Sequence, residues 1–394
     1  MRESRPLGEK KEDGSASKHF RILHTESSME LGGQEFRVLS EACGMRDRGH
    51  FVVLAVPSGS QIEVRAKQQG LLVEAVNMSR LRWFWLIWVF LKIVSKHRIN
   101  VVSTHGSIDS WTASIAGRVS KHKPLIVRTR HKSTPISNTL RHQWLYRKLP
   151  DVVVTTGERV RRNIIDQLRL PGQQVVSIPT GVDIQKFQMT DQGDSKPSQI
   201  HGESQDCLIG TVSFLRGYKG LLYFLRAANL VISKLSHVKF VIVGDGPDFD
   251  LLKEETQKLG LGNHLLMTGF REDVAELLSE MDVFVLSSTE AEGLPQALTQ
   301  AMAMEKAVIA TNVGSIPEVV DDQKTGILVT PRNVEELAEA ICELVLHQEL
   351  RDRLGQAARA CIERSYSVQI MLSHTETLYE HLQKSMNRTL PCPA

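Results

Sequence analysis

The stretch T-E-A-E-G-L-P-Q-A-L-T-Q-A-M-A-M, residues 289–304, follows the apolar run D-V-F-V-L-S at 282–287, which predicts a buried strand. Glu292 lies on the Gly-Leu-Pro turn that opens the next helix, and Gln300 follows eight positions later. A strand, a turn and a helix N-terminus bring backbone N–H groups and a partial positive charge together, which favours an anionic ligand. This stretch therefore predicts an α/β fold with a ligand site at the carboxyl end of the strand.

The same alternation of short β-branched runs and helical patterns continues along the chain, and it is typical of parallel sheets covered by helices. The strands expected in the first half are 20–24, 51–55, 100–104, 124–128, 151–155 and 175–178. Those expected in the second half are 207–213, 238–244, 265–268, 282–287, 307–311 and 326–329. Two doubly wound, Rossmann-like domains would face a cleft lined by the carboxyl ends of their strands.

Composition shifts divide the chain. Residues 1–18 are charged, contain Gly and Ser and lack an apolar segment, so we expect a disordered tail and not a signal peptide. Residues 188–206 are polar and aperiodic, which predicts a linker between a first domain at 19–187 and a second at 207–365. Residues 366–394 are expected to hold a final helix and a tail.

Overall composition, 41% hydrophobic and 24% charged over 394 residues, is ordinary for a globular protein. The five cysteines show no C-x-x-C spacing, which argues against a zinc site or a disulfide framework and favours a reducing, cytoplasmic compartment. Residues 1–180 hold 29 basic and 15 acidic side chains, a net charge of +14, although the whole chain carries only +3. The two domains either differ simply in isoelectric point, or the first faces an anionic surface.

Residues 80–98 contain the unusual segment L-R-W-F-W-L-I-W-V-F-L-K-I-V at 81–94. Its uncharged run, 83–91, is too short to span a bilayer, which needs about 20 residues. It is either a packing helix or an interfacial helix, because tryptophans beside Lys and Arg are typical of headgroup anchors. The second alternative predicts peripheral contact with the inner face of a membrane.

Several loops carry residues suited to phosphates. Gly32-Gly33 follows the first strand and opens a helix, so the backbone there can approach a ligand closely. Arg216 and Lys219 lie between a strand and a helix, where an arginine binds phosphate bidentately and a lysine adds a point charge. Asp248 and Asp250 form a D-x-D triplet, but they follow a proline at a helix start, so we expect no metal there.

Two further loops of the first domain combine polar and basic residues. His105 ends a strand at the rim of the expected cleft. It is either a ligand-binding residue or a residue that only caps the strand. A group of basic side chains follows another strand: Arg128, Arg130, His131 and Lys132. These residues form either a solvated loop or an anion site. Such a site would bind either the acceptor or the donor phosphates. Thr155 and Glu158 have the spacing of a capping box, which predicts a helix start.

Taken in order, these motifs resemble glycosyltransferase family 4, the group 1 enzymes of retaining mechanism and GT-B fold, over residues 20–329. Glu292 and Gln300 match its E-x7-E signature with glutamine in the second place, and Glu290 competes for the first. Residues 32–35 resemble its G-G-x-E loop, and 178–183 its hinge segment with Thr180 in place of the usual asparagine. Further matches are 243–247, 269–271, 314–318 and 325–326.

The resemblance implies a UDP- or GDP-sugar donor, no cofactor and no metal, with a final helix crossing back to the first domain. Arg216, Lys219 and the N–H groups near Gly33 would stabilise the departing diphosphate, while Glu292 and His105 contact the donor sugar. Gln300 would bind the ribose more weakly than a glutamate. The remaining donor-binding residues that the resemblance implies are Gly32, Gly269, Phe270, Arg271, Gly293, Leu294 and Pro295.

The basic first half, with Arg128, Arg130 and Lys132, fits a glycolipid or polysaccharide acceptor of negative charge, as in the assembly of bacterial lipopolysaccharide or another surface glycan. A nucleotide-sugar epimerase on the same fold is the main alternative. A protein that binds an anionic polymer is another, although no aromatic-basic element such as an RNP motif supports nucleic acid. The first strand precedes no G-x-G-x-x-G, which argues against a dinucleotide-dependent oxidoreductase.

Overall fold

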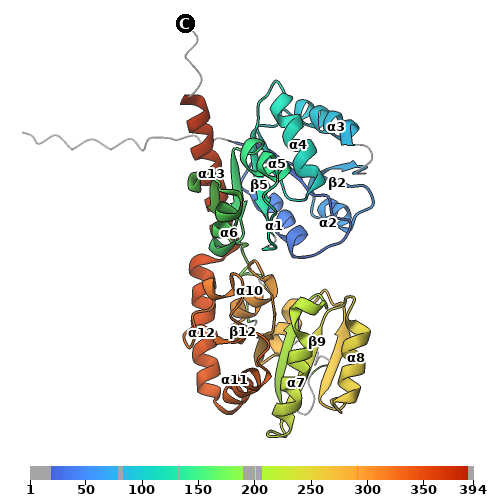
Figure 1. The fold of residues 1–394 in the computed structure, drawn as a ribbon, viewed down its shortest axis with the longest axis vertical. Coiled ribbons are helices and arrows are strands. Elements are labelled where there is room, and N and C mark those ends of the chain that lie inside the picture. Colours follow the sequence, from blue (N-terminus) through green and yellow to red (C-terminus); the bar gives the residue numbers. More distant parts are fainter. Residues whose placement is uncertain are drawn as a thin grey trace, which may run out of the picture.

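The computed structural model describes residues 19–78, 83–131, 133–189, 200, 206–290 and 292–388. They form two α/β domains stacked along the long axis of the molecule, each built on one parallel sheet (Figure 1). The expected tail at 1–18 and most of the linker at 188–206 lie outside the described residues.

The first sheet has seven parallel strands in the order β3-β2-β1-β4-β5-β6-β7. The strands are β1 (Arg21–Thr25), β2 (Phe51–Pro57), β3 (Leu72–Val76), β4 (Val101–Thr104), β5 (Leu125–Arg130), β6 (Val152–Thr155) and β7 (Val175–Ser177). The order reverses between β1 and β4, which places a ligand-binding crevice at their carboxyl ends.

Helices cover both faces of the first sheet. They are α1 (Gly33–Asp47), α2 (Gln61–Gln68), α3 (Trp83–Lys96), α4 (Ile108–Val119), α5 (Leu140–Gln143), a π-helical turn (Trp144–Lys148) and α6 (Glu158–Leu168). Apolar side chains pack on each face, with Val38 and Leu54 in one cluster and Leu86 and Phe90 in another. Strands buried on both faces explain the continuous apolar runs of the sequence.

The second sheet has six parallel strands in the order β10-β9-β8-β11-β12-β13. They are β8 (Cys207–Val212), β9 (Val238–Val243), β10 (Leu265–Gly269), β11 (Val283–Leu286), β12 (Ala307–Thr311) and β13 (Ile327–Val329). The helices are α7 (Leu221–Ile232), α8 (Phe249–Lys258), α9 (Val274–Glu280), α10 (Gln296–Ala303), α11 (Val334–Leu346) and α12 (Gln348–Ser365). The predicted pair of doubly wound domains is thus confirmed.

The last helix, α13 (Val368–Arg388), leaves the second domain and lies against the first, as Figure 1 shows. Glu376 on α13 accepts hydrogen bonds from Arg48 and faces His50, at 2.8 and 2.9 Å. A Cβ on Gly44 of α1 would lie 2.3 Å from Leu372, so the two helices pack closely. The return of the final helix to the first domain, expected from the resemblance, is confirmed.

Two details of the structure differ from the sequence-based expectations. All twelve expected strands are present, but β3 was missed, because Leu72 is 45% exposed and Glu74 binds Lys96 and His97 at the sheet edge. Such a polar edge strand lacks the continuous apolar run of a central strand. The predicted capping box is wrong, because Gly157 is the N-cap of α6 and the hydroxyl of Thr155 donates to the Gly157 carbonyl instead.

Candidate functional site

A cleft of about 2450 Å³ lies between the two domains. Its walls come from the loops that follow β1, β4 and β5 in the first domain and β8, β9, β10 and β11 in the second. The domains also contact each other across it, since Gln296 Nε2 donates to the Gly33 carbonyl at 3.1 Å and Arg65 pairs with Glu272. Both sheets therefore present their carboxyl ends to one shared space.

An ion pair lies on the second-domain wall of this cleft. Lys219 Nζ lies 2.5 Å from Glu292 Oε2, and the two side chains are 14% and 10% exposed. Ser288 donates a hydrogen bond to the other oxygen of Glu292. Glu290 also lines the cleft, but its side chain is exposed, and among the described residues no ion pair of Glu290 is found. The glutamate that pairs with Lys219 is thus Glu292.

The other side chains predicted for the second-domain part of the site also line the cleft. Arg216 lines the cleft and lies over the Phe214 ring, with its Cζ 5.1 Å from the ring centroid. Phe270 is 63% exposed and Gln300 half-buried, and both line the cleft. Arg271 lines it as well, but its guanidinium pairs with Asp273.

Two of the predicted backbone segments differ in their position relative to the cleft. Gly293, Leu294 and Pro295 line the cleft just before α10, and a Cβ on Gly293 would lie 2.9 Å from Thr156 Oγ1 of the first domain. Gly269 does not line the cleft; it has φ +71° and its carbonyl accepts a hydrogen bond from Gly244. Gly269 therefore shapes the turn that presents Phe270.

The first-domain glycine loop faces this wall. Gly32 is the N-cap of α1, and its N–H donates to Glu35 Oε2 at 2.8 Å. A Cβ on Gly33 would reach only Gln296, at 4.0 Å. The start of α1 thus offers an open approach with a positive dipole end directed at the cleft.

Three imidazoles form a row from the sheet to the cleft. His105 Nε2 lies 3.2 Å from His24 Nδ1, and His105 Nδ1 lies 3.0 Å from His131 Nε2. Burial and the charge of His131 hold the pKa of His105 well below its usual value, and burial lowers that of His24. Because a neutral imidazole carries one N–H, the tautomer of His105 depends on both neighbours.

Two arginines on the first-domain wall lack acidic partners among the described residues. Arg128 is 5% exposed and donates to the Gly106 carbonyl and to the Tyr146 hydroxyl, at 3.2 and 3.1 Å. Arg130 donates to Thr134, and the Nε atoms of both arginines have no hydrogen-bond partner. Positive charge buried without a counterion favours an anionic ligand. Lys132, the third predicted member, lies outside the described residues.

Glu26 is a cleft residue that the sequence analysis missed. Burial raises its pKa to about 8, with a further contribution from Asp109, although the N–H groups of Ser27 and Ser28 and the amide of Gln34 bind it. Burial therefore favours the neutral form of this carboxyl, which repels an anion less than the ionised form does. Its position directly after the first strand was the available signal.

Within the described ranges, neither a cluster of metal ligands nor a membrane-spanning helix is present. No group of three or more His, Cys, Asp or Glu side chains there could hold a metal ion. Asp248 is the N-cap of α8 and Asp250 lies in its first turn, which is the helix start predicted for the D-x-D triplet. No helix in the same ranges is long and apolar enough to cross a membrane. The four cysteines among these residues, 43, 207, 342 and 361, are free thiols.

Comparisons with known proteins agree with this geometry. Residues 31–186 match the model of Glycosyltransferase Family 4, and residues 195–360 match that of Glycosyl transferases group 1. The phosphatidyl-myo-inositol mannosyltransferase of Mycobacterium tuberculosis is 27% identical over 377 residues, 89% of this chain and 93% of the relative. The UDP-Gal:alpha-D-GlcNAc-diphosphoundecaprenol alpha-1,3-galactosyltransferase of Escherichia coli is 26% identical over 77% of this chain and 81% of its own length.

A further relative, the N-acetyl-alpha-D-glucosaminyl L-malate synthase of Bacillus anthracis, is 28% identical, but the match spans 58% of this chain and 59% of that protein. A glycosyltransferase from Rickettsia africae superposes with a TM-score of 0.82 at 21% identity, over 93% of this chain and 99% of the other. Anabaena HepE in complex with UDP and glucose superposes with a TM-score of 0.80 at 22% identity, over 92% and 100%. The fold is GT-B, and the chain belongs to the group 1 glycosyltransferases of the family 4 type.

Proposed function

We propose that this glycosyltransferase moves a sugar from a UDP- or GDP-sugar to a hydroxyl group of an anionic glycolipid or polysaccharide, with retention at the anomeric carbon. The observation that carries the proposal is the Lys219–Glu292 ion pair, which lines the same cleft as the glycine loop at Gly33. A cation for the diphosphate and a carboxylate for sugar hydroxyls lie side by side there. The division into domains at 19–187 and 207–365, joined at 188–206 and followed by 366–394, is part of this proposal.

The chemistry needs a group that stabilises the leaving diphosphate. Lys219, Arg216 and the N–H groups at the start of α1 supply positive charge where negative charge develops, which is the role assigned to a metal in other transferases. We therefore propose that the reaction is independent of metal. As the sugar–diphosphate bond breaks, the acceptor oxygen bonds to the anomeric carbon on the same face, and its proton passes to a diphosphate oxygen.

The donor sugar and ribose would be held on the second domain. In this proposal Glu292 accepts hydrogen bonds from sugar hydroxyls and stabilises the positive charge that develops at the anomeric carbon. Gln300, on α10, contacts the ribose, and Phe270 lies beside the base. His105 contacts the sugar from the first domain in its neutral form. The remaining donor contacts are the backbone at 32–33 and 293–295.

Arg128 and Arg130 support an anionic acceptor. Both side chains line the cleft on its first-domain side, and their Nε atoms have no hydrogen-bond partner. A phosphate or carboxylate on the acceptor would supply the missing acceptors. The names of two relatives, which include a diphosphoundecaprenol and a phosphatidylinositol substrate, support a phosphorylated lipid in bacterial surface-glycan or lipopolysaccharide assembly.

The first domain exposes aromatic side chains beside basic ones. Leu86 and Phe90 of α3 are buried, whereas Phe84, Trp85 and Trp88 are 80%, 43% and 51% exposed. Lys92 lies over the Trp88 ring, 3.4 Å from its centroid. The helix thus packs with one face and presents an aromatic, basic face outward, as interfacial helices do. Residues 79–82, which include the first part of the predicted 80–98 contact, lie outside the described residues.

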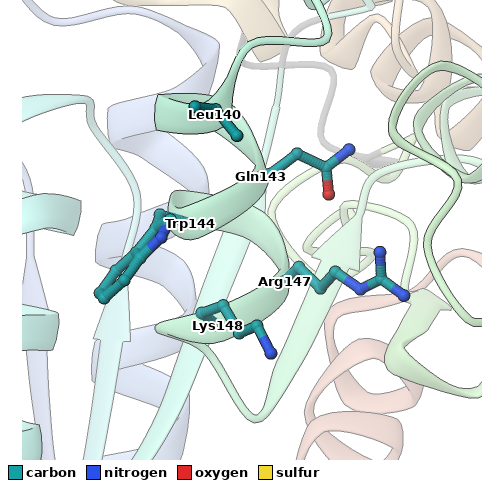
Figure 2. A pocket seen from close by; sticks show the side chains of 5 residues that line it. All are labelled: Leu140, Gln143, Trp144, Arg147 and Lys148. Atoms are coloured by element: carbon teal, nitrogen blue, oxygen red, sulfur yellow. The ribbon is translucent and has the colours of Figure 1, made fainter.

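A further exposed aromatic side chain, Trp144, lies elsewhere on the same domain. A shallow hollow of about 360 Å³ is lined by Leu140, Gln143, Trp144, Arg147 and Lys148 (Figure 2). Leu140 and Trp144 are 86% and 59% exposed, and Figure 2 shows Trp144 and Arg147 extending to opposite sides of the π-helical turn. We propose that α3 and this turn together contact an anionic membrane surface on its inner side.

Replacing Trp85 and Trp88 with serine should weaken binding to vesicles that contain anionic lipid by at least tenfold. Burial of one large apolar side chain is worth about 1.5–3 kcal/mol, and both rings are half exposed here. Vesicle co-sedimentation at low and high salt measures the effect. Leu346→Ser is the matched control, since Leu346 is 63% exposed on the second domain. Equal vesicle binding by the double variant and the control would contradict membrane contact through α3.

The proposed activity is tested by measuring nucleoside diphosphate release from UDP-, GDP- and ADP-sugars, with and without a crude lipid extract. Release from one UDP- or GDP-sugar, increased by the extract, is the expected result. Release of nucleoside diphosphate with an epimerised free sugar, independent of any acceptor, would favour the epimerase. The absence of both release and binding for all donors would contradict the proposal.

A further inference from the structure

The N-terminus of α6 in the first domain is capped by a carboxylate from the second domain. Glu318 Oε2 accepts a hydrogen bond from the N–H of Glu158, and Oε1 accepts one from the N–H of Arg159, both at 2.7 Å. The N-cap residue, Gly157, has no side chain that could make these bonds. A carboxylate at this place satisfies unpaired N–H groups and is stabilised by the helix dipole. Helix α6 is thus capped in the arrangement of the two domains that this structure shows.

The contact around this cap is tight. A Cβ on Gly157 would lie 2.4 Å from Ser315 Oγ and 3.1 Å from Glu318 Oε2. Arg159 Nη1 also donates to the Gly314 carbonyl at 3.2 Å. Residues 314–318, which we call the closure segment, therefore fit against the first domain with no room for an added methyl group.

The opposite side of the closure segment is fixed to Glu292. The N–H of Ser315 donates to the Glu292 carbonyl at 3.0 Å. Gly314 has φ +55°, and a Cβ there would lie 2.1 Å from the same carbonyl oxygen. Because the two backbones touch, the closure segment and the backbone of Glu292 must move together. The Glu292 carboxylate in turn holds Lys219.

The closure segment is also tied to the point where the chain crosses between the domains. The Tyr366 hydroxyl donates to the Glu318 carbonyl at 2.7 Å. The Tyr366 carbonyl accepts from the N–H of Val182, and the N–H of Val368 donates to the Val182 carbonyl, at 2.8 and 2.9 Å. A rotation of the domains about this crossing would break the cap on α6 while the closure segment stays with the second domain.

From these contacts we infer that Glu318 is a positioning residue: by capping α6 it holds the domains closed and fixes Glu292 opposite the glycine loop of the first domain. Glu318 does not line the cleft, so it acts through Glu292 and not on a substrate. The inference rests on the proposed function of Glu292. The Glu318 carboxylate acts through two charge-assisted hydrogen bonds to α6, and both are lost when the domains separate.

Two variants test the inference from opposite sides. Glu318→Gln keeps the size of the side chain, but its amide can accept from only one N–H and turns an NH2 group toward the other. Gly157→Ala leaves the second domain unchanged and pushes a methyl group against Ser315; Gly157 has φ −171°, so alanine fits the backbone. Glu336→Gln is the matched control, because Glu336 accepts from the Thr330 N–H and the Asn333 amide within the second domain.

We expect Glu318→Gln and Gly157→Ala to lower kcat about tenfold, while the KM for the donor and the Kd of UDP or GDP change less than twofold. The radius of gyration from small-angle X-ray scattering should rise in both variants and stay constant in the control. An unchanged radius in both variants overturns the inference, and so does a loss of nucleotide affinity equal to the loss of kcat. Should the wild type transfer no sugar, the scattering result still decides whether Glu318 holds the domains closed.

Discussion

Glu292→Gln should lower the rate of sugar transfer by about 10³-fold, which is the upper range for loss of one preorganised electrostatic group. The substitution keeps the shape of the side chain and a hydrogen-bond acceptor for Lys219 and Ser288, but it removes the charge proposed to stabilise the anomeric centre. Nucleotide binding should be unchanged or tighter, because Lys219 loses its counterion and becomes free to bind the diphosphate. Steady-state transfer assays and calorimetry with UDP and GDP measure the two quantities.

Glu290→Gln is the control that decides which glutamate acts. Glu290 is exposed and lines the same cleft two residues earlier, so its substitution should leave the transfer rate within about threefold of the wild type, as for a surface change worth less than about 0.5 kcal/mol. A large loss in Glu290→Gln with wild-type transfer in Glu292→Gln would reverse the assignment. Retained nucleotide binding in both variants shows that the site is folded.

The periodic elements of the fold were predictable from the sequence because their burial is extreme. Strands such as β12, A-V-I-A-T, are buried at every position, and this leaves a continuous apolar run. The edge strand β3 was not predictable in the same way, because Glu74 and an exposed Leu72 give it the character of a loop. The local sequence pattern reflects how deeply a segment is buried, and an edge strand is only partly buried.

The candidate site was predictable where its residues follow strands, and not where it depends on pairing between distant segments. Glu292 and Lys219 were each indicated by a strand and a helix start, but their ion pair joins two βα loops that no spacing relates. The Thr155–Glu158 spacing suggested a local cap for α6, and the real cap, Glu318, comes from 160 residues away. Interdomain contacts of this kind leave no periodic pattern in the sequence, because they depend on how two folded domains pack against each other.

Lys219→Ala should weaken binding of UDP or GDP about 10- to 100-fold, since a hydrogen bond to a charged group is worth about 1.5–3 kcal/mol. The transfer rate should fall further, because the lysine stabilises charge that grows as the diphosphate leaves. In this variant Glu292, whose side chain is 10% exposed, also loses its cationic partner and lies beside the nucleotide phosphates. Part of the loss in affinity is therefore repulsion by this carboxylate.

That repulsion gives the experiment a second, sharper test. In the Lys219→Ala/Glu292→Gln double variant the carboxylate that lost its cation is gone. Nucleotide affinity should therefore recover relative to Lys219→Ala by more than Glu292→Gln raises the affinity of the wild type, a non-additivity expected of residues in contact. Lys219→Arg should retain most of the affinity, and Lys239→Ala, which removes a lysine bound to the Asn263 carbonyl on the surface, should retain all of it. Strict additivity of the two single variants, measured by calorimetry, would mean that Lys219 and Glu292 act on the nucleotide independently and that the pair is not the diphosphate site.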